Sequence, residues 1–405
     1  MSISFADIEA ADRLLEGRIV RTPFLRSETL SAISGADLFL KFENRQYTAS
    51  FKDRGAYIYL AELDEAQRQA GVIALSAGNH AQGVAYHAKR MGVPATIVMP
   101  EATPFSKVRA AEFLGAEVIL RGETISEGET FIHERAEAEG LTFVHPYDDA
   151  RIVAGQGTVG LEMLRAVPGL DFLVVPVGGG GLIAGIALAA KALSPETRVI
   201  GVEATGYPSM HHALRGLAPP PGGPTIAEGI AVKRPGALTL PLVRELVEDI
   251  LLVDEAAMEQ GVQLLAEIEK TVAEGAGAAA LAAVLSHPER FHGRRVGLVV
   301  SGGNIDARLL ASVLMRGLVR GGRLVRLRIE IQDQPGGLAR ATAAIARAGG
   351  NIVEVQHQRW FEDVPIKLTD IEVALETRDE AHVGQVLEAL QAAGMHAVRL
   401  SSRSI

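Results

Sequence analysis

Residues 172–181 read FLVVPVGGGG, so a short apolar run leads directly into four consecutive glycines. The run is typical of a buried strand, and the glycines stand between it and a predicted helix. Glycine at such a boundary permits tight turns and close approach of the backbone. The segment therefore predicts a strand, loop and helix unit of the kind that builds a parallel sheet.

The same order of strand, loop and helix recurs elsewhere in the chain. The buried run Val72-Ile-Ala-Leu75 leads into Ser76-Ala-Gly-Asn-His-Ala-Gln-Gly83 and then into a helix that ends near residue 90. This alternation predicts an α/β fold with two groups of parallel strands. A stretch rich in Pro and Gly, about residues 204–240, interrupts the pattern and is predicted to be a long loop. Further strands are predicted at 95–99, 116–120, 141–144, 198–203, 250–253 and 296–300.

The composition changes near residue 316, where arginines flank Gly321-Gly322, and residues 319–324 are predicted to be a linker. The order of elements that follows is βαββαβ, which is the ferredoxin-like arrangement. We predict a strand at 325–331, a helix at 337–348, strands at 352–359 and 366–376, a helix at 380–392 and a strand at 397–400.

Composition and charge exclude several classes of protein. The 405 residues include 40 Lys and Arg against 49 Asp and Glu, which gives a formal net charge of −9. This balance disfavours partners such as nucleic acid or an anionic membrane, because both attract basic surfaces. The sequence has no apolar run that could span a bilayer and no signal peptide, so we expect a cytoplasmic protein. The lack of cysteine excludes disulfides, thiolate metal sites and cysteine nucleophiles.

The glycine loop alone is compatible with more than one ligand. Gly179-Gly-Gly181-Leu-Ile-Ala184 matches the G-x-G-x-x-A pattern of dinucleotide sites, and Glu203 ends the next strand. Four glycines at a helix N-terminus can equally cradle any phosphate through their backbone N–H groups. A nicotinamide oxidoreductase therefore stays open at this point. A serine hydrolase and a catalytic metal are disfavoured, because no G-x-S-x-G segment exists and the histidines lack the spacing of a zinc helix.

One lysine has an unusual sequence context. Lys52 lies in Thr48-Ala-Ser-Phe-Lys52-Asp-Arg-Gly-Ala56, at a predicted helix N-terminus. A lysine beside the positive end of a helix and packed by Phe51 should have a lowered pKa, which a Schiff-base lysine needs. The segment therefore predicts a reactive lysine instead of a surface charge.

Four motifs occur together in one order: the Lys52 segment, Ser76-Ala-Gly-Asn79-His80, the four glycines, and Ser301-Gly-Gly-Asn304. In that order they resemble the fold type II family of pyridoxal-phosphate enzymes, and most closely its threonine ammonia-lyases, also called threonine dehydratases. The resemblance covers about residues 5–318. It implies a core similar to the tryptophan synthase β subunit, with a large cofactor-binding domain of residues 1–70 and 149–318 and a small domain of residues 71–148.

The resemblance also assigns roles to individual residues. Pyridoxal 5'-phosphate would be held by Lys52 as the covalent anchor and catalytic base, Phe51 against the ring, Asn79 at the phenolic oxygen, Gly178, Gly179, Gly180 and Gly181 at the phosphate, and Ser301 at the pyridine nitrogen. The substrate carboxylate would lie on the turn formed by Ser76, Ala77, Gly78, Asn79 and His80. A neutral serine at the ring nitrogen makes the ring a weaker electron sink, which suits β-elimination.

The implied reaction converts L-threonine to 2-oxobutanoate and ammonia, and L-serine to pyruvate. Dehydratases of hydroxyaspartate or serine and serine racemases share the fold and are alternatives; a non-catalytic amino-acid sensor is a remote one. Ala77 stands where serine racemases have the serine that reprotonates the substrate. Ser209 stands where their metal site has an Asp beside Glu203, so we expect no metal. Asp53 and Ala49 depart from the ammonia-lyase pattern and leave the substrate open.

The C-terminal residues 325–405 resemble an ACT domain, a small module that senses amino acids. The resemblance rests on Asp333-Gln-Pro-Gly336-Gly-Leu after the first strand and on Gly350-Asn351-Ile352 at the second. It implies an effector pocket lined by Asp333, Gly336, Asn351 and Ile352, with isoleucine or valine as the effector. A purely structural or dimerising module is the alternative, since the fold alone implies no ligand. We expect a homodimer or homotetramer.

Overall fold

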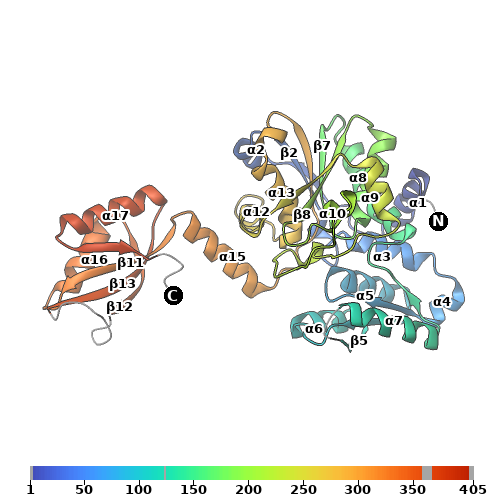
Figure 1. The fold of residues 1–405 in the computed structure, drawn as a ribbon, viewed down its shortest axis with the longest axis horizontal. Coiled ribbons are helices and arrows are strands. Elements are labelled where there is room, and N and C mark those ends of the chain that lie inside the picture. The colour runs from blue at the N-terminus through green and yellow to red at the C-terminus, as the bar shows by residue number, and fades with distance from the viewer. Residues whose placement is uncertain (1–2, 123–124, 358–366, 401–405) are drawn as a thin grey trace. The chain divides into compact units, whose positions relative to one another are not determined.

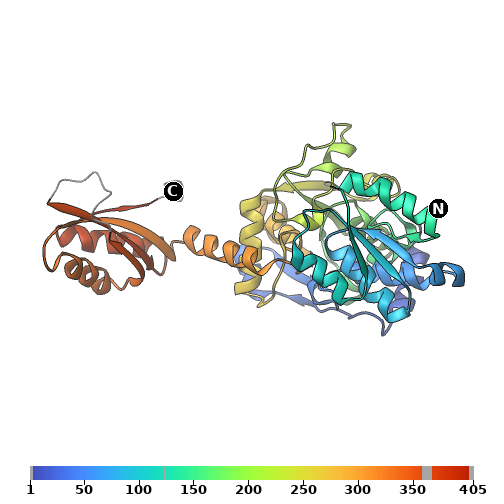
Figure 2. The same cartoon turned by 90° about the horizontal axis from the view of Figure 1, so that it is seen from below.

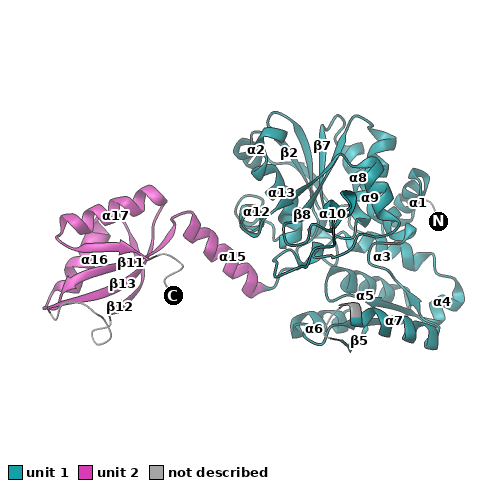
Figure 3. Ribbon diagram, viewed as in Figure 1, with its two compact units in different colours: residues 1–306 teal, residues 307–405 magenta. Residues whose placement is uncertain are grey.

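The computed structural model describes residues 3–122, 125–357 and 367–400. The chain forms two compact units, which we call the core unit (residues 1–306) and the C-terminal unit (residues 307–405) (Figures 1 and 3). The core unit contains a six-stranded and a four-stranded sheet, and the C-terminal unit contains one four-stranded sheet. The predicted fold class, an α/β core followed by a ferredoxin-like unit, is confirmed.

The six-stranded sheet has the order β1-β2-β10-β7-β8-β9, and every neighbouring pair is parallel except β1 with β2. Its strands are β1 (Phe24–Arg26), β2 (Asp37–Phe42), β7 (Phe172–Pro176), β8 (Arg198–Ala204), β9 (Asp249–Val253) and β10 (Arg295–Val300). β1 and β2 were not predicted. β1 has only three residues, and β2 carries Lys41, a charge that is 1% exposed in a buried strand.

Helices cover both faces of this sheet, and its apolar core is built largely from β7, α8 and α9. Parallel strands that are buried on both faces read as continuous apolar runs, which is why β7 could be recognised in the sequence. The helices and 3₁₀ turns of this part are α1 (Phe5–Leu15), α2 (Glu28–Ser34), η1 (Glu43–Arg45), α3 (Lys52–Ala61), α8 (Ala150–Ala166), α9 (Gly181–Leu193), α10 (Ser209–Leu214), η2 (Glu228–Ile230), α11 (Thr239–Leu246), α12 (Glu255–Glu267), α13 (Gly275–Ser286) and α14 (Pro288–Phe291).

The smaller sheet has the order β5-β4-β3-β6 and all its neighbours are parallel. It is formed by β3 (Val72–Leu75), β4 (Ala95–Met99), β5 (Glu117–Leu120) and β6 (Thr142–Phe143), with helices α4 (Glu65–Ala70), α5 (Asn79–Met91), α6 (Phe105–Phe113) and α7 (Ile125–Glu139). Helix α5 packs against α3 of the larger part, so the two sheets meet close to Lys52 (Figure 1).

The C-terminal unit has an antiparallel sheet in the order β12-β13-β11-β14, with α16 and α17 packed on one face (Figure 2). Its elements are α15 (Ala307–Arg320), β11 (Leu324–Gln332), α16 (Gly337–Arg347), β12 (Asn351–His357), β13 (Leu368–Glu376), α17 (Glu380–Ala392) and β14 (His396–Arg399). Residues 358, 359 and 366, predicted as strand, lie outside the described residues. The predicted linker 319–324 differs from the structure, because α15 extends to Arg320 and β11 begins at Leu324.

Candidate active site

The ends of several strands bring the predicted site residues together within the core unit. β7 ends just before the four glycines, β3 ends just before the Ser76 turn, and β10 ends just before Ser301. In open parallel sheets, ligands bind outside the carboxyl ends of the strands. The topology therefore places three of the four predicted motifs at such ends, and Lys52 at the start of α3 beside them.

Lys52 is the first residue of α3 and its side chain is partly buried. Its Nζ donates a hydrogen bond to the carbonyl oxygen of Pro146 at 2.6 Å. Burial lowers the pKa of Lys52 to about 8, and the attraction of Glu274 opposes that decrease. An amine with this pKa is a better nucleophile and base near neutral pH than an ordinary lysine.

The Ser301 loop is tied to the Lys52 loop by backbone hydrogen bonds. The N–H of Phe51 donates to the carbonyl of Ser301 at 3.0 Å, and the N–H of Gly303 donates to the carbonyl of Ala49 at 2.9 Å. Ala49 adopts a φ of 54°, a left-handed conformation that favours glycine. Alanine at position 49 therefore carries local strain. The Ser301 side chain is 3% exposed.

Asn79 lies at the centre of a chain of side-chain hydrogen bonds. Its Oδ1 accepts from Asn304 Nδ2 at 2.7 Å, and its Nδ2 donates to Glu274 Oε1 at 2.6 Å. Asn304 Nδ2 also donates to the carbonyl of Thr48 at 2.7 Å. The chain joins the start of α5 to two loops of the larger part. Sequence analysis missed Glu274 because a single acidic residue before a helix carries no signal of its own.

The four glycines form a narrow backbone loop at the start of α9. Gly180 is the N-cap residue with a φ of 96°, and no described side chain caps the helix. The first N–H groups of a helix have no partner within it, so they are free to bind an anion. A Cβ at Gly179 would lie 2.2 Å from the Tyr147 ring, and one at Gly180 would lie 2.7 Å from Met210 Cε. The loop therefore needs glycine at both positions.

The Ser76 turn precedes α5, and its side chains play different parts. Ser76 Oγ accepts a hydrogen bond from the N–H of Gly78 at 3.2 Å. His80 is buried, and its Nε2 lies 2.9 Å from the carbonyl oxygen of Val144. Burial lowers the pKa of His80 to about 3, so the ring is neutral and Nε2 donates. The His80 ring therefore serves the packing of the small sheet, and the backbone of this turn can offer N–H groups to an anion.

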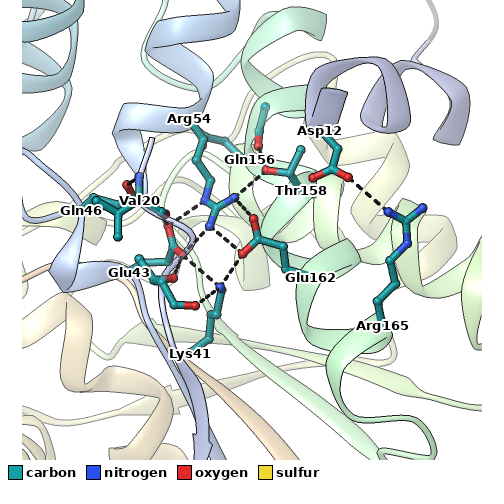
Figure 4. A network of polar contacts seen from close by, with 12 residues as sticks. Asp12, Val20, Lys41, Glu43, Gln46, Arg54, Gln156, Thr158, Glu162 and Arg165 are labelled. Carbon is teal, nitrogen blue, oxygen red and sulfur yellow. Dashed lines mark hydrogen bonds and ion pairs between the residues drawn. The ribbon is translucent and has the colours of Figure 1, made fainter. Parts of the chain in front are cut away.

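A buried network of charges supports the helix that carries Lys52 (Figure 4). Arg54 donates to Glu43 and to Glu162 through both ends of its guanidinium, at 2.7 to 3.1 Å, and to Thr158 Oγ1 at 2.9 Å. Lys41 Nζ donates to Glu162 Oε2 at 2.5 Å. Two cations and two carboxylates balance here, so the network can be buried without net charge.

Glu203 has a structural role in this structure. Its carboxylate accepts hydrogen bonds from the N–H groups of Met210 and His211 at 2.8 and 2.9 Å and from Ser209 Oγ at 3.2 Å. These groups begin α10. In the described part of the chain, no group of three or more His, Asp or Glu side chains is arranged to hold a metal ion, and no helix there is long and apolar enough to cross a membrane.

Lys52, with its lowered pKa, contacts Pro146, and the ring of the next residue, Tyr147, lies against the uncapped glycine loop. This combination of a reactive lysine and a glycine-rich helix start indicates a class of protein. It is an α/β enzyme that binds a phosphate-bearing aldehyde through a lysine. A family model described as pyridoxal-phosphate dependent enzyme matches residues 15–302, and an ACT domain model matches residues 325–394. The chain belongs to the family of pyridoxal-phosphate dependent enzymes and carries an ACT domain. The cofactor is pyridoxal phosphate.

Similar proteins cover most of the chain. A relative named L-threonine ammonia-lyase from Thermotoga maritima is 45% identical over 97% of this chain and 98% of its own length. The structure of the processed form of threonine deaminase isoform 2 from Solanum lycopersicum is 34% identical, with a TM-score of 0.72 over 77% of this chain and 91% of that one. The structure of maize serine racemase is 35% identical, with a TM-score of 0.73 over 79% of this chain and 99% of that one.

The residues present fit this cofactor. The glycine loop carries no side chains of its own, so its backbone N–H groups at the start of α9 are available to a phosphate. Lys52 is the amine that an aldehyde requires, and Asn79 and Ser301 lie on loops bonded to the Lys52 loop. Ser301 brings a neutral hydroxyl, so the chain does not place a carboxylate at that position.

Proposed function

We propose that this protein is a threonine ammonia-lyase, which converts L-threonine to 2-oxobutanoate and ammonia and L-serine to pyruvate and ammonia. The observation that carries the proposal is the full-length similarity to the Thermotoga maritima relative, which includes the C-terminal unit. The reaction removes the Cα proton and the β-hydroxyl as water, and water then replaces the amino group, so the atoms balance without any oxidant.

The positions of the side chains support the proposed roles. Bound pyridoxal phosphate withdraws electrons from Cα when the substrate amine is attached to it. Lys52 Nζ, with its lowered pKa, removes the Cα proton. The N–H groups of Gly178 to Gly181 would hold the phosphate, the second N–H of Asn79 Nδ2 would donate to the phenolic oxygen, and Ser301 would contact the ring nitrogen. Phe51 packs against the ring, and backbone N–H groups from Ser76 to His80 bind the substrate carboxylate.

A racemase is the second candidate, because the maize serine racemase structure covers a similar share of the chain. Racemisation needs an acid on the face of the substrate opposite Lys52. Ala77 in the Ser76 turn has no proton to donate there. We therefore favour elimination over racemisation.

An assay of 2-oxo acid release tests the function directly. L-threonine, L-serine and threo-3-hydroxyaspartate are compared at equal concentration, and chiral analysis of serine detects racemisation. We expect threonine to be preferred and Lys52→Ala to lose activity by at least a thousandfold while its far-UV circular dichroism is unchanged. Preference for hydroxyaspartate would refute threonine as the substrate, and deamination by Lys52→Ala would refute Lys52 as the base.

We also propose that isoleucine or valine binds the C-terminal unit. One copy cannot bring the four expected residues together. Asp333 follows the end of β11, which pairs with the start of β13, whereas Asn351 pairs with Glu376 at the other end of β13. Eight residues of strand separate those ends by about 26 Å. A pocket that contains Asp333, Gly336, Asn351 and Ile352 therefore requires two copies side by side, which supports a homodimer or a homotetramer.

Strand β12 offers the edge for such pairing. It is the outer strand of its sheet, and Val353 and Val355 are 57% and 38% exposed. Exposed apolar residues on an edge strand favour pairing with another strand. Asn351→Ala should weaken the isoleucine or valine response about tenfold or more in a dose–response assay. An unchanged response would place the effector site elsewhere.

A further inference from the structure

The residue that we single out is Glu274, the last residue before α13. Its carboxylate is 9% exposed, and its backbone N–H donates to the carbonyl of Gly302 at 3.1 Å. Two glycines leave the space that the carboxylate occupies. A Cβ at Gly302 would lie 2.5 Å from Glu274 Oε1, and one at Gly229 would lie 3.1 Å from the same atom. The carboxylate is thus built into a fitted backbone cradle beside the proposed active site.

The hydrogen-bond chain gives the Asn79 amide a single orientation. Asn304 Nδ2 contacts the backbone carbonyl of Thr48, and a carbonyl can only accept, so this atom is a donor nitrogen. It also contacts Asn79, which must accept there through Oδ1. The Asn79 nitrogen then lies against Glu274 Oε1 at 2.6 Å. One of its two hydrogens is held by Glu274, and the other is left for the cofactor.

Charged groups from several elements act on Glu274. Lys52 on α3 attracts it, Lys107 on α6 attracts it, and Glu228 on η2 repels it. Burial raises the pKa of Glu274 to about 7, against the hydrogen bond from Asn79. The attraction is mutual, since Glu274 raises the pKa of Lys52 against the effect of burial. The carboxylate of Glu274 therefore attracts the amine of Lys52 and also holds the amide of Asn79.

We propose that Glu274 is a positioning residue: it fixes the Asn79 amide toward the cofactor and places a carboxylate in the same site as the amine of Lys52. The proposal rests on the proposed function, because it concerns the same site. It adds a residue that acts through Asn79 and a reason for the pH at which Lys52 becomes free to react.

The first test measures the protonation of Lys52 without any turnover. The full-length protein is freed of cofactor, and the rate at which Lys52 captures pyridoxal 5'-phosphate is followed by absorbance across pH. Glu274→Gln should move the midpoint of this profile to lower pH by about 1 pH unit, because an opposite charge near an amine raises its pKa by about that amount. An unchanged midpoint would overturn the electrostatic part of the proposal.

Glu203→Gln is the matched control. Glu203 is also buried, and burial also raises its pKa to about 7, but it binds the start of α10 and not Asn79. We expect the control to leave the midpoint unchanged even where it lowers the melting temperature. An equal shift in both variants would overturn the proposal, because it would show a general effect of losing a buried carboxylate.

The second test separates the hydrogen bond from the charge. Glutamine at position 274 keeps an oxygen that accepts from Asn79 Nδ2, whereas alanine keeps none. Glu274→Ala should weaken cofactor binding about tenfold more than Glu274→Gln, since alanine leaves a buried N–H of Asn79 without an acceptor; tenfold corresponds to about 1.4 kcal/mol. Equal affinities would overturn the positioning role. If the wild-type protein fails to deaminate threonine, the proposed function is refuted. The pH midpoint of cofactor capture and the cofactor affinity still test the role of Glu274, because neither measurement needs turnover.

Discussion

Replacement of Arg54 by leucine tests how the buried charge network supports the proposed active site. Arg54 makes five hydrogen bonds, and its side chain is fully buried together with Glu43 (Figure 4). Although burial alone would raise the pKa of Glu43, Arg54 and then Lys41 lower it from 4.5 to about 2. A decrease of that size corresponds to about 3 kcal/mol of stability. Breaking a buried pair by removing one partner costs about 3 to 5 kcal/mol.

The sign of the pH dependence follows from the direction of that pKa. The contribution of Glu43 is present above pH 4.5 and is lost as the pH falls through about 2. In Arg54→Leu, Glu43 loses Arg54 and keeps Lys41, at 3.8 Å, as a cationic partner. Because Arg54 lowers the pKa of Glu43 more than Lys41 does, that pKa should rise in the variant, and the ionisation of Glu43 should oppose folding near neutral pH. The difference in free energy of unfolding between wild type and variant should therefore be largest at pH 7 and should decrease in acid.

Urea unfolding of the cofactor-loaded protein at pH 7, 5 and 4 measures this difference. Arg165→Leu is the control, because Arg165 pairs with Asp12 and Glu9 at the surface and its side chain is 45% exposed. We expect Arg165→Leu to lower the free energy of unfolding by about 1 kcal/mol or less. Arg54→Lys should recover part of the loss, since lysine restores the charge without the planar fork. A loss below about 1 kcal/mol in Arg54→Leu, or a difference that grows in acid, would refute the reasoning.

Two other changes probe the loops around the site. Gly180→Ala should lower cofactor affinity at least tenfold in an absorbance titration, because its φ of 96° and a Cβ contact of 2.7 Å both oppose alanine. Gly216→Ala, with a φ of 67° and no atom within 4 Å of its Cβ, should cost about 1 kcal/mol of stability and leave the affinity unchanged. Asp148→Ala removes hydrogen bonds from the N–H groups of residues 237 and 238, both at 2.8 Å. We expect a loss of about 3 kcal/mol in thermal or urea unfolding, and a loss below about 1 kcal/mol would show that the loop is held by other contacts.

The parallel strands were predictable because they are buried on both faces. β3, β4, β7 and β10 are mostly apolar, apart from Thr96 in β4 and Arg295 at the start of β10, and each was predicted within one residue of its observed bounds. β1 and β2 were missed for a physical reason. Lys41 lies in β2 because Glu162, 121 residues later, supplies its partner. A charge that is neutralised by tertiary contact cannot be recognised as buried from its neighbours in sequence.

The residues of the candidate site also fall into those that the sequence predicts and those that it does not. Lys52, the glycine loop and Ser301 were predictable because they occur in short local motifs. Glu274 and Tyr147 were not, since each acts through a contact with a segment far away in sequence. Asn304 was part of a motif, but its partner Asn79, 225 residues away, could not be identified from the sequence. Asp333 and Asn351, which we expect to line one effector pocket, lie at opposite ends of the sheet in a single copy. The antiparallel register of β13 sets this separation, and no local motif encodes that register.

The position of Asn79 links the geometry of the site to the packing of the two sheets. Asn79 begins α5, which belongs with the smaller sheet, whereas Glu274 and Asn304 stand on loops of the larger one. The hydrogen bonds of 2.6 and 2.7 Å that join them are the contacts that hold the amide. A displacement of α5 by about 1 Å along these bonds would stretch them to the limit of hydrogen bonding. The orientation of the Asn79 amide therefore depends on how the two sheets of the core unit pack against each other, so any change in that packing would also disturb the contact that we propose between Asn79 and the cofactor.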